Sequence, residues 1–234
     1  MRFLKWSLKR RLRTTKAGAF MYKLFVYDHC PFCIKARMIF GLRHIPFDLI
    51  ILQNNDEATP KQMIGQKMVP ILEENGHFMG ESMDIVAHID AQGTPLLTGP
   101  TNPALAEWIR RSNGPLYKQF LPRAACAPFP EFSTTAGRAY FVRTKERSTG
   151  AFTDILSEGA AALEPLAALL EDLAPMVQSP EAVNGALSTD DIHLFAQLHS
   201  FSLIGGLTYP AAVEAYRQTM SKQCGIRLLD DLAI

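Results

Sequence analysis

The residues most capable of chemistry are Cys30 and Cys33, which enclose Pro31 and Phe32 in the stretch YDHCPFCIKAR. Such a Cys-x-x-Cys pair can be half of a metal site, an inert buried pair or a redox centre. A zinc site needs three or four ligands, usually including a second cysteine pair or two histidines at fixed spacing. The sequence has no second cysteine pair, and His29 is too close along the chain to share a metal easily with Cys30. We therefore predict no metal at this motif.

The position of Cys30 favours a redox centre over an inert pair. Residues 23–27 form a short apolar run typical of a buried strand, and helical spacing begins at Pro31, a residue suited to the first turn of a helix. Cys30 is thus expected at a helix N-terminus, where free N–H groups and the helix dipole stabilise a thiolate. CxxC thiols placed in this way have pKa values of roughly 3.5–7.5, so they react at neutral pH. The three-residue spacing puts Cys33 on the same face, within reach of a disulfide with Cys30.

The elements that must position this motif follow a strand–helix–strand pattern. Residues 47–52 are a second apolar strand, which predicts a parallel βαβ unit. Asn75–Gly76 is a strong hairpin signal. The stretch ESMDIVAHIDAQ then predicts a helix with Ser82 as its N-cap. We therefore predict one compact α/β domain over residues 21–92.

The second half of the chain is predicted to be all-helical. Residues 93–103 are rich in Gly, Pro and Thr and predict a linker, and residues 104–234 show no convincing strand pattern. Pro165 is expected to kink or divide one helix, and Ser188 and Asp191 have the spacing of an N-terminal capping pair. Helical spacing is found over residues 104–120, 137–147, 153–173, 190–203 and 211–222.

Length and composition limit the classes of protein further. The 234 residues, 47% of them hydrophobic, are enough for one large domain or two modest ones. Four cysteines are too few for a disulfide scaffold and favour a reducing compartment, so we predict a cytoplasmic location. No apolar run reaches the length of about 18 residues that a membrane span requires.

Basic residues are concentrated at the N-terminus. Residues 1–20 carry seven of the 24 Lys and Arg side chains and no acid, so the rest of the chain is mildly acidic and gives no sign of a nucleic-acid surface. We predict that residues 1–20 are a disordered extension. The alternative is a weak basic amphipathic helix that lies on a membrane.

Two further features predict a binding surface near the cysteines. In a thioredoxin-like arrangement the Val69–Pro70 turn, often a cis peptide, faces Cys30, and Val69 offers its backbone N–H and C=O to an extended ligand. Glu81 and Ser82 stand where a helix begins, so free N–H groups there can bind a carboxylate while Glu81 holds an ammonium group. A strand-opening proline and an ordinary acidic helix cap are the plainer interpretations.

Taken in order, CPFC at a strand–helix junction, VPIL and ESMD resemble the glutaredoxins, and the glutathione S-transferase superfamily shares the last two features. The stretches YDHCPFCIKARMIFGL, GQKMVPIL, ESMDIV, PLLTG and NGALSTDDIHLF together resemble the bacterial glutaredoxin 2 family, the large two-domain glutaredoxins. The resemblance runs from about Met21 to Ile234. Two departures stand out: Phe32 replaces the tyrosine of CPYC, and residues 1–20 have no counterpart.

The resemblance implies an α/β thioredoxin-like (glutaredoxin) domain followed by an all-α domain like that of glutathione S-transferases. It implies a glutathione-dependent thiol–disulfide oxidoreductase that reduces protein–glutathione mixed disulfides and small disulfides. Glutathione is then the co-substrate, no cofactor is permanently bound, and the partners are glutathionylated or disulfide-bonded proteins; we expect a monomer. The implied site residues are catalytic Cys30 and Cys33 and glutathione-binding Val69, Pro70, Glu81 and Ser82.

Two other functions stay open at this point. A glutathione transferase would activate the thiol of glutathione itself and would not require Cys33. A non-enzymatic, glutathione-binding scaffold of the intracellular chloride-channel-like type would need no turnover and would associate reversibly with lipid. Cys126 and Cys224 have no cysteine nearby, so we expect both to be structural or incidental.

Overall fold

The computed structural model describes residues 22–234. The expected disordered or membrane-binding extension, residues 1–20, lies outside this range. The described chain starts with the predicted βαβ unit, in which the two strands pair in parallel with Leu24 opposite Leu49. Its elements are β1 (Tyr22–Val26), α1 (Pro31–Leu42) and β2 (Asp48–Ile51).

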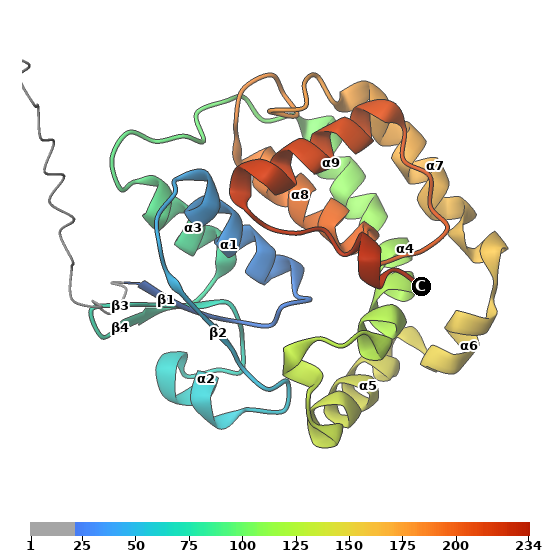
Figure 1. Ribbon diagram of the computed structural model, residues 1–234, viewed down its shortest axis with the longest axis horizontal. Helices are drawn as coiled ribbons and strands as arrows, with labels where there is room; N and C mark the ends of the chain where they lie inside the picture. The colour runs from blue at the N-terminus through green and yellow to red at the C-terminus, as the bar shows by residue number, and fades with distance from the viewer. Residues whose placement is uncertain (1–21) are drawn as a thin grey trace, which may run out of the picture.

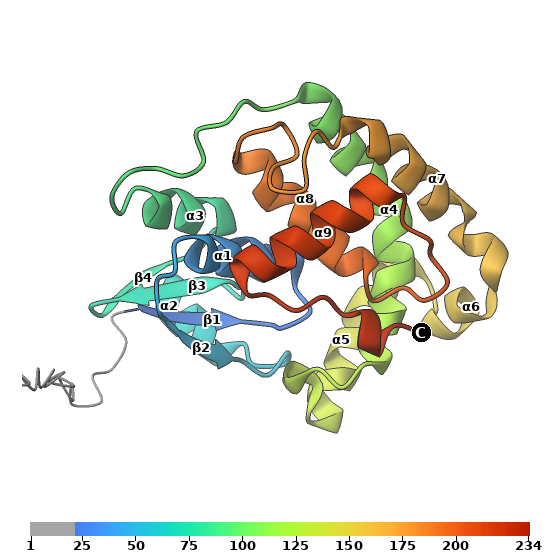
Figure 2. The same cartoon turned by 45° about the horizontal axis from the view of Figure 1, so that its top comes forward.

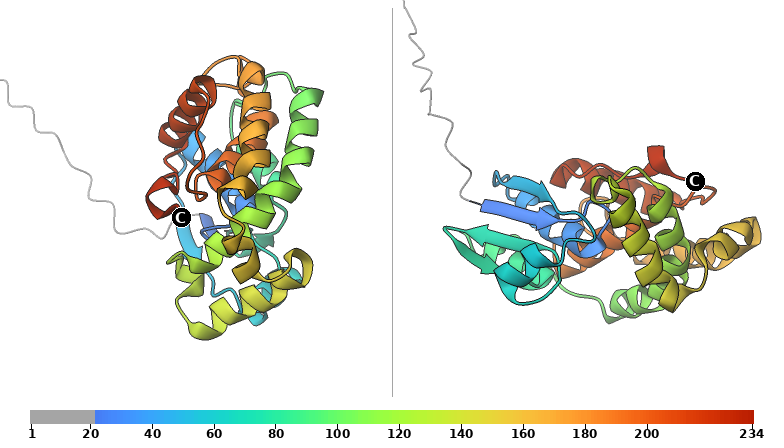
Figure 3. Two further views of the ribbon diagram at one scale, coloured as in Figure 1. Left: turned by 90° about the vertical axis from the view of Figure 1, so that its right-hand side faces the viewer. Right: turned by 90° about the horizontal axis from the view of Figure 1, so that it is seen from below.

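A four-stranded mixed sheet forms the α/β half, with strand order β2-β1-β3-β4. Asn75 and Gly76 both have positive φ, 52° and 81°, which confirms the predicted hairpin between β3 and β4. In Figure 1, α1 and α3 lie side by side above the sheet and α2 lies below it; the view from below in Figure 3 agrees. The remaining elements of this half are α2 (Ala58–Ile64), β3 (Ile71–Glu74), β4 (His77–Met79) and α3 (Ser82–Asp90).

The prediction that Ser82 is the N-cap of α3 is wrong. The helix begins at Ser82 itself, and Glu81 occupies the cap position without a side-chain hydrogen bond to the helix. Glu81 has φ 60° and ψ 113°, so the chain turns sharply into the helix one residue earlier than expected. The buried Ser82 is therefore part of the first helical turn.

All strands of the described residues lie in this first half, and the second half is helical as predicted. Its first helix continues beyond the predicted range to Cys126, through Pro115 and Pro122. The predicted break near Pro165 is confirmed, because α6 ends at Ser157 and Pro165 lies in the first turn of α7. The helices are α4 (Pro103–Cys126), α5 (Thr135–Thr149), α6 (Phe152–Ser157), α7 (Glu164–Leu173), α8 (Thr189–Phe201) and α9 (Ala211–Cys224), with short 3-10 turns η1 (Pro130–Phe132), η2 (Ala160–Leu163), η3 (Ala174–Met176) and η4 (Asp230–Leu232).

The predicted capping pair at the start of α8 is confirmed, and Asp191 makes further hydrogen bonds that were not predicted. The fully buried Asp191 carboxylate accepts hydrogen bonds from the backbone N–H of Ser188 at 2.9 Å and of Val183 at 2.7 Å. It also accepts one from the Tyr216 hydroxyl at 3.0 Å. One side chain thus joins α8 to α9 and to the loop before α8.

The two halves pack tightly, with α1 against α8 and α9, and share one apolar core (Figures 1 and 2). The backbones come very close at Gly41 on α1, where an added Cβ would lie 1.9 Å from the carbonyl oxygen of Cys224 on α9. Only glycine fits that contact. The segment between α3 and α4 contains no helix or strand, and its role as a linker over residues 93–103 between separate domains stays a prediction. None of the helices within residues 22–234 is both long and apolar enough to cross a membrane.

Candidate active site

Cys30 stands at the N-cap of α1, and Pro31 is the first residue of that helix. This is the local arrangement predicted from the sequence. The Cys30 side chain is partly exposed, whereas Cys33, one turn later, is fully buried. The Cys33 sulfur accepts a hydrogen bond from the backbone N–H of Tyr27 at 3.4 Å, so the end of β1 holds the second cysteine in place. Both cysteines are free thiols.

The two thiols differ sharply in acidity. A hydrogen bond from Cys33 lowers the pKa of Cys30 from 9.0 to about 6, against the opposing effect of burial, and the charge of His29 and the first-turn N–H groups add to the lowering. Burial raises the pKa of Cys33 well above its usual range, and the neighbouring Cys30 raises it further. Near neutral pH Cys30 is therefore mainly a thiolate, whereas Cys33 is a protonated thiol.

Cys30 opens into a cleft of about 620 Å³ between the two halves. Of the residues predicted to bind a ligand, Val69 lines this cleft, and its peptide bond to Pro70 is cis. Pro70, Glu81 and Ser82 do not line the cleft, and the last two lie at the start of α3. The cleft residues from the helical half include Tyr117, Phe120, Leu121, Tyr140, Phe141, Thr144, Lys145, Ser148 and Thr149.

Lys67 is a cleft residue that the sequence analysis did not identify. Its ammonium group donates to the carbonyl oxygen of Asn54 at 2.7 Å and lies 3.6 Å from the centre of the Tyr140 ring. Tyr140 in turn donates to Glu57 at 2.9 Å. Together with Lys145 on α5, which also lines the cleft, this side chain gives the cleft a positive charge suited to an anionic ligand.

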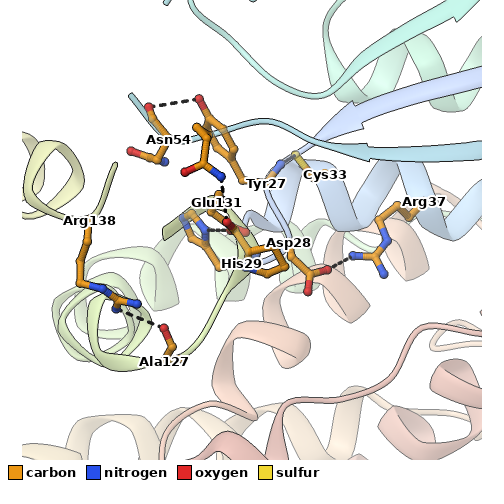
Figure 4. A network of polar contacts seen from close by, with 11 residues as sticks. Tyr27, Asp28, His29, Cys33, Arg37, Asn54, Ala127, Glu131 and Arg138 are labelled. Atoms are coloured by element: carbon orange, nitrogen blue, oxygen red, sulfur yellow. Dashed lines mark hydrogen bonds and ion pairs between the residues drawn. The ribbon is translucent and has the colours of Figure 1, made fainter. Parts of the chain in front are cut away.

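A second feature absent from the sequence analysis is a buried pair formed by His29 and Glu131 (Figure 4). The Glu131 Oε1 atom accepts hydrogen bonds from the backbone N–H of His29, at 3.0 Å, and from its ring Nδ1. Burial acts to raise the pKa of Glu131, but the hydrogen bonds and charge of His29 outweigh it, so the pKa lies below its usual value. The sequence signal was slight: an acid between Pro130 and Phe132 in a turn.

Within residues 22–234, no three His, Cys, Asp or Glu side chains are grouped closely enough to hold a metal ion.

The other two cysteines lie away from the cleft. Cys126 is exposed at the end of α4, and Cys224 is buried at the end of α9, where burial raises its pKa to about 12. We expect a Cys126→Ser/Cys224→Ala protein to form the Cys30–Cys33 disulfide on oxidation as the parent does. Peptide mapping by mass spectrometry checks this. A bridge from either distant cysteine to Cys30 or Cys33 in the oxidised parent would contradict the assignment.

Comparisons with known proteins agree with this geometry. The model of the glutathione S-transferase N-terminal domain matches residues 24–95, and that of the glutaredoxin 2 C-terminal domain matches residues 104–233. A glutathione S-transferase of Ceriporiopsis subvermispora, solved with glutathione, is 17% identical, covers 92% of this chain and 98% of its own, and has a TM-score of 0.65. At that identity the likeness extends to the fold alone.

The similarity to glutaredoxin 2 proteins is much higher. Glutaredoxin 2 of Escherichia coli K12 is 49% identical over 214 residues, which cover 91% of this chain and 100% of the relative. The crystal structure of glutaredoxin 2 from Salmonella typhimurium, in complex with glutathione, is 50% identical and has a TM-score of 0.90 over 92% of this chain and 100% of its own. With a cysteine pair at the start of α1 and a matching helical half, the chain belongs to the glutaredoxin 2 family.

Proposed function

We propose that this protein is a glutathione-dependent thiol–disulfide oxidoreductase with Cys30 as the nucleophile and Cys33 as the resolving thiol. One observation carries the proposal: Cys30, a partly exposed thiol at a helix N-terminus, lines a cleft and is followed one turn later by Cys33, a fully buried second thiol. In such a pair, the first sulfur acts as the nucleophile and the second can resolve the mixed disulfide that forms.

In the reaction, the Cys30 thiolate attacks the glutathione sulfur of a mixed disulfide, and the substrate thiolate leaves. Cys30 is then disulfide-bonded to glutathione. In the first resolving route, a second glutathione thiolate attacks that disulfide, releases oxidised glutathione and regenerates Cys30. In the second route, Cys33 loses its proton and attacks Cys30, which releases reduced glutathione and leaves a Cys30–Cys33 disulfide.

Glutathione fits the chemistry of the cleft. The backbone of Val69 before Pro70 lines the same cleft as Cys30 and offers main-chain pairing to a short extended peptide. Lys67 supplies positive charge for an anionic ligand. Glu81 and Ser82, at the start of α3, are proposed to hold the far end of glutathione, its ammonium and carboxylate groups.

The proposal includes the wider setting. Glutathione serves as co-substrate, no cofactor is permanently bound, and glutathionylated or disulfide-bonded proteins are the partners of a monomeric, cytoplasmic enzyme. The supporting observations are the pair of free thiols at the cleft and the family to which the chain belongs. A glutathione transferase would have no need of the buried Cys33 beside Cys30, so the thiol pair favours disulfide chemistry over conjugation.

Replacing Cys33 with serine tests the proposed function. Because glutathione resolves the adduct and a serine hydroxyl can still donate to the Cys30 sulfur, we expect Cys33→Ser to keep much of the parent turnover on a glutathionylated small disulfide. The variant should lose reduction routes that pass through the Cys30–Cys33 disulfide. The measurement is glutathione oxidation, coupled to glutathione reductase and NADPH consumption.

Two results would count against the proposal. If Cys33→Ser were inactive on the glutathionylated substrate, the first resolving route would be wrong. If the parent failed to reduce that substrate but joined glutathione to a chlorinated aromatic electrophile, the protein would be a transferase. Reactions without glutathione supply the background for both assays.

A further inference from the structure

The His29–Glu131 pair links the helical half of the molecule to the residue directly before Cys30. His29 and Glu131 are 102 residues apart, and their side chains are almost completely buried, with exposed fractions of 7% and 0%. The carboxylate holds both the main chain and the ring of His29 through a single oxygen, Oε1. The main-chain carbonyl of Glu131 also accepts from the N–H of Asn54 at 3.0 Å. The turn η1 thereby anchors the loops that follow both parallel strands.

The environment of this pair makes an unpaired charge costly. Phenylalanine rings surround the imidazole, and the second carboxylate oxygen of Glu131 is buried without a hydrogen-bond partner. An ionised carboxylate in such a place is costly unless a positive group contacts it. The imidazole of His29 is the group in contact. A buried Glu131 that stays ionised therefore depends on the His29 ring as its hydrogen-bond donor.

A positive imidazole at this place acts on the neighbouring sulfur. His29 directly precedes Cys30, and its charge favours the thiolate form of that cysteine. Within residues 22–234, the other ionisable groups that interact with the sulfur are Cys33 and Lys35 on α1, Tyr27 at the end of β1 and Tyr117 on α4.

Three further charged or titratable groups project from the surrounding helices. His193 on α8 is near Lys35, and Arg37 on α1 is paired with Asp28 at 2.6 Å. Arg138 on α5 donates to main-chain carbonyls around the η1 turn. None of these three positive or titratable groups forms a hydrogen bond to the carboxylate of Glu131.

We propose that Glu131 is a positioning residue for the reactive thiolate: from the helical half, it holds the imidazolium of His29 beside the Cys30 sulfur. The inference rests on the proposed function, since it gives Glu131 a part in the same redox centre. It assigns a task to the helical half beyond forming one wall of the cleft. Without Glu131, the α/β half would contain both cysteines and lack this stabilisation of the thiolate.

The test measures the thiolate directly, in the absence of glutathione. Cys30 of the reduced protein is alkylated with iodoacetamide over a pH series, and the modified peptide is quantified by mass spectrometry. In Glu131→Gln we expect the rate at pH 6 to fall about fivefold and the rate well above pH 8 to stay unchanged, as for a thiol whose pKa rises by about one unit. Glutamine keeps the size and an acceptor oxygen, so only the charge is removed.

A matched control separates charge from anchoring. Gln53 holds the same turn from the other side, donating to the carbonyl of Pro130 at 3.1 Å and to the hydroxyl of Ser133 at 2.9 Å. Gln53→Ala should leave the pH profile of Cys30 alkylation unchanged. A profile shifted equally by Gln53→Ala and Glu131→Gln would overturn the proposal, because placement of the turn would then explain both results.

A double variant tests whether His29 and Glu131 act on Cys30 as a unit. His29→Gln/Glu131→Gln carries a neutral amide pair, which avoids a buried unpaired carboxylate. If the two residues act as a unit, its alkylation profile should match that of Glu131→Gln alone. An unchanged or acid-shifted profile in Glu131→Gln would overturn the inference even if the parent turns over glutathionylated substrates normally. Conversely, the parent could fail to reduce glutathionylated substrates while Glu131→Gln still shows the expected shift in Cys30 alkylation. That result would overturn the proposed function and leave the role of Glu131 standing.

Discussion

Cys30→Ser is expected to abolish the reduction of glutathione mixed disulfides. No other cysteine combines an accessible sulfur with a helix N-terminus, since Cys33 is buried and protonated, Cys126 lies at a helix C-terminus and Cys224 is buried. A serine hydroxyl is not ionised near neutral pH and cannot form the mixed disulfide with glutathione. The glutathione-coupled assay measures the loss.

The comparison with other variants makes that result specific. Cys126→Ser removes an exposed thiol from the same protein and should leave turnover at the parent value. The melting temperature of Cys30→Ser should also stay close to that of the parent, because the substitution is small and lies at the cleft. Retention of about a tenth or more of the parent rate by Cys30→Ser would exclude this cysteine as the nucleophile.

Asp191→Ala is expected to produce a large loss of stability in the helical half. The change leaves three buried donors without their acceptor: the N–H groups of Ser188 and Val183 and the hydroxyl of Tyr216. Each unsatisfied buried group costs about 1–3 kcal/mol, and partial repair by water or chain shifts reduces the sum, so we expect a loss of about 3–5 kcal/mol. Urea denaturation followed by circular dichroism measures it.

Asp154→Ala is the matched control for this substitution. Asp154 also lies in the first turn of a helix, α6, but its side chain is exposed, so its replacement should change the free energy of unfolding by less than about 0.5 kcal/mol. Asp191→Asn keeps the side-chain size and one acceptor oxygen and should fall between the two. An Asp191→Ala protein as stable as the control would show that the buried hydrogen bonds are not what holds α8 and α9 together.

The sequence correctly predicted turns and helix boundaries whose conformation is set by one or two neighbouring residues. Pro31 marked the first turn of α1 and thereby placed Cys30 at the N-cap. Asn75–Gly76 set the hairpin because both residues adopt positive φ. Pro165 correctly predicted a division of the helical stretch 153–173, and it lies in the first turn of α7, where a residue without an N–H is tolerated.

Features that depend on distant contacts were beyond such signals. Glu131 joins the redox centre only because η1 packs beside the loop after β1, and no periodicity in the sequence relates it to His29. The error at Ser82 came from judging a cap by residue type, whereas the left-handed conformation of Glu81 decides where α3 starts. Packing likewise carries α4 through Pro122, a residue that by itself ends helices.

The sequence separation of His29 and Glu131 has a consequence during synthesis of the chain. At about 5–20 residues per second, a ribosome adds the 102 residues between them in roughly 5–20 s. For nearly all of that interval both cysteines have been translated, but the carboxylate partner of His29 has not. If Glu131 stabilises the Cys30 thiolate as proposed, Cys30 is a weaker acid in the nascent chain than in the finished protein. Its reactivity would then rise only late in folding, when the η1 turn docks beside His29.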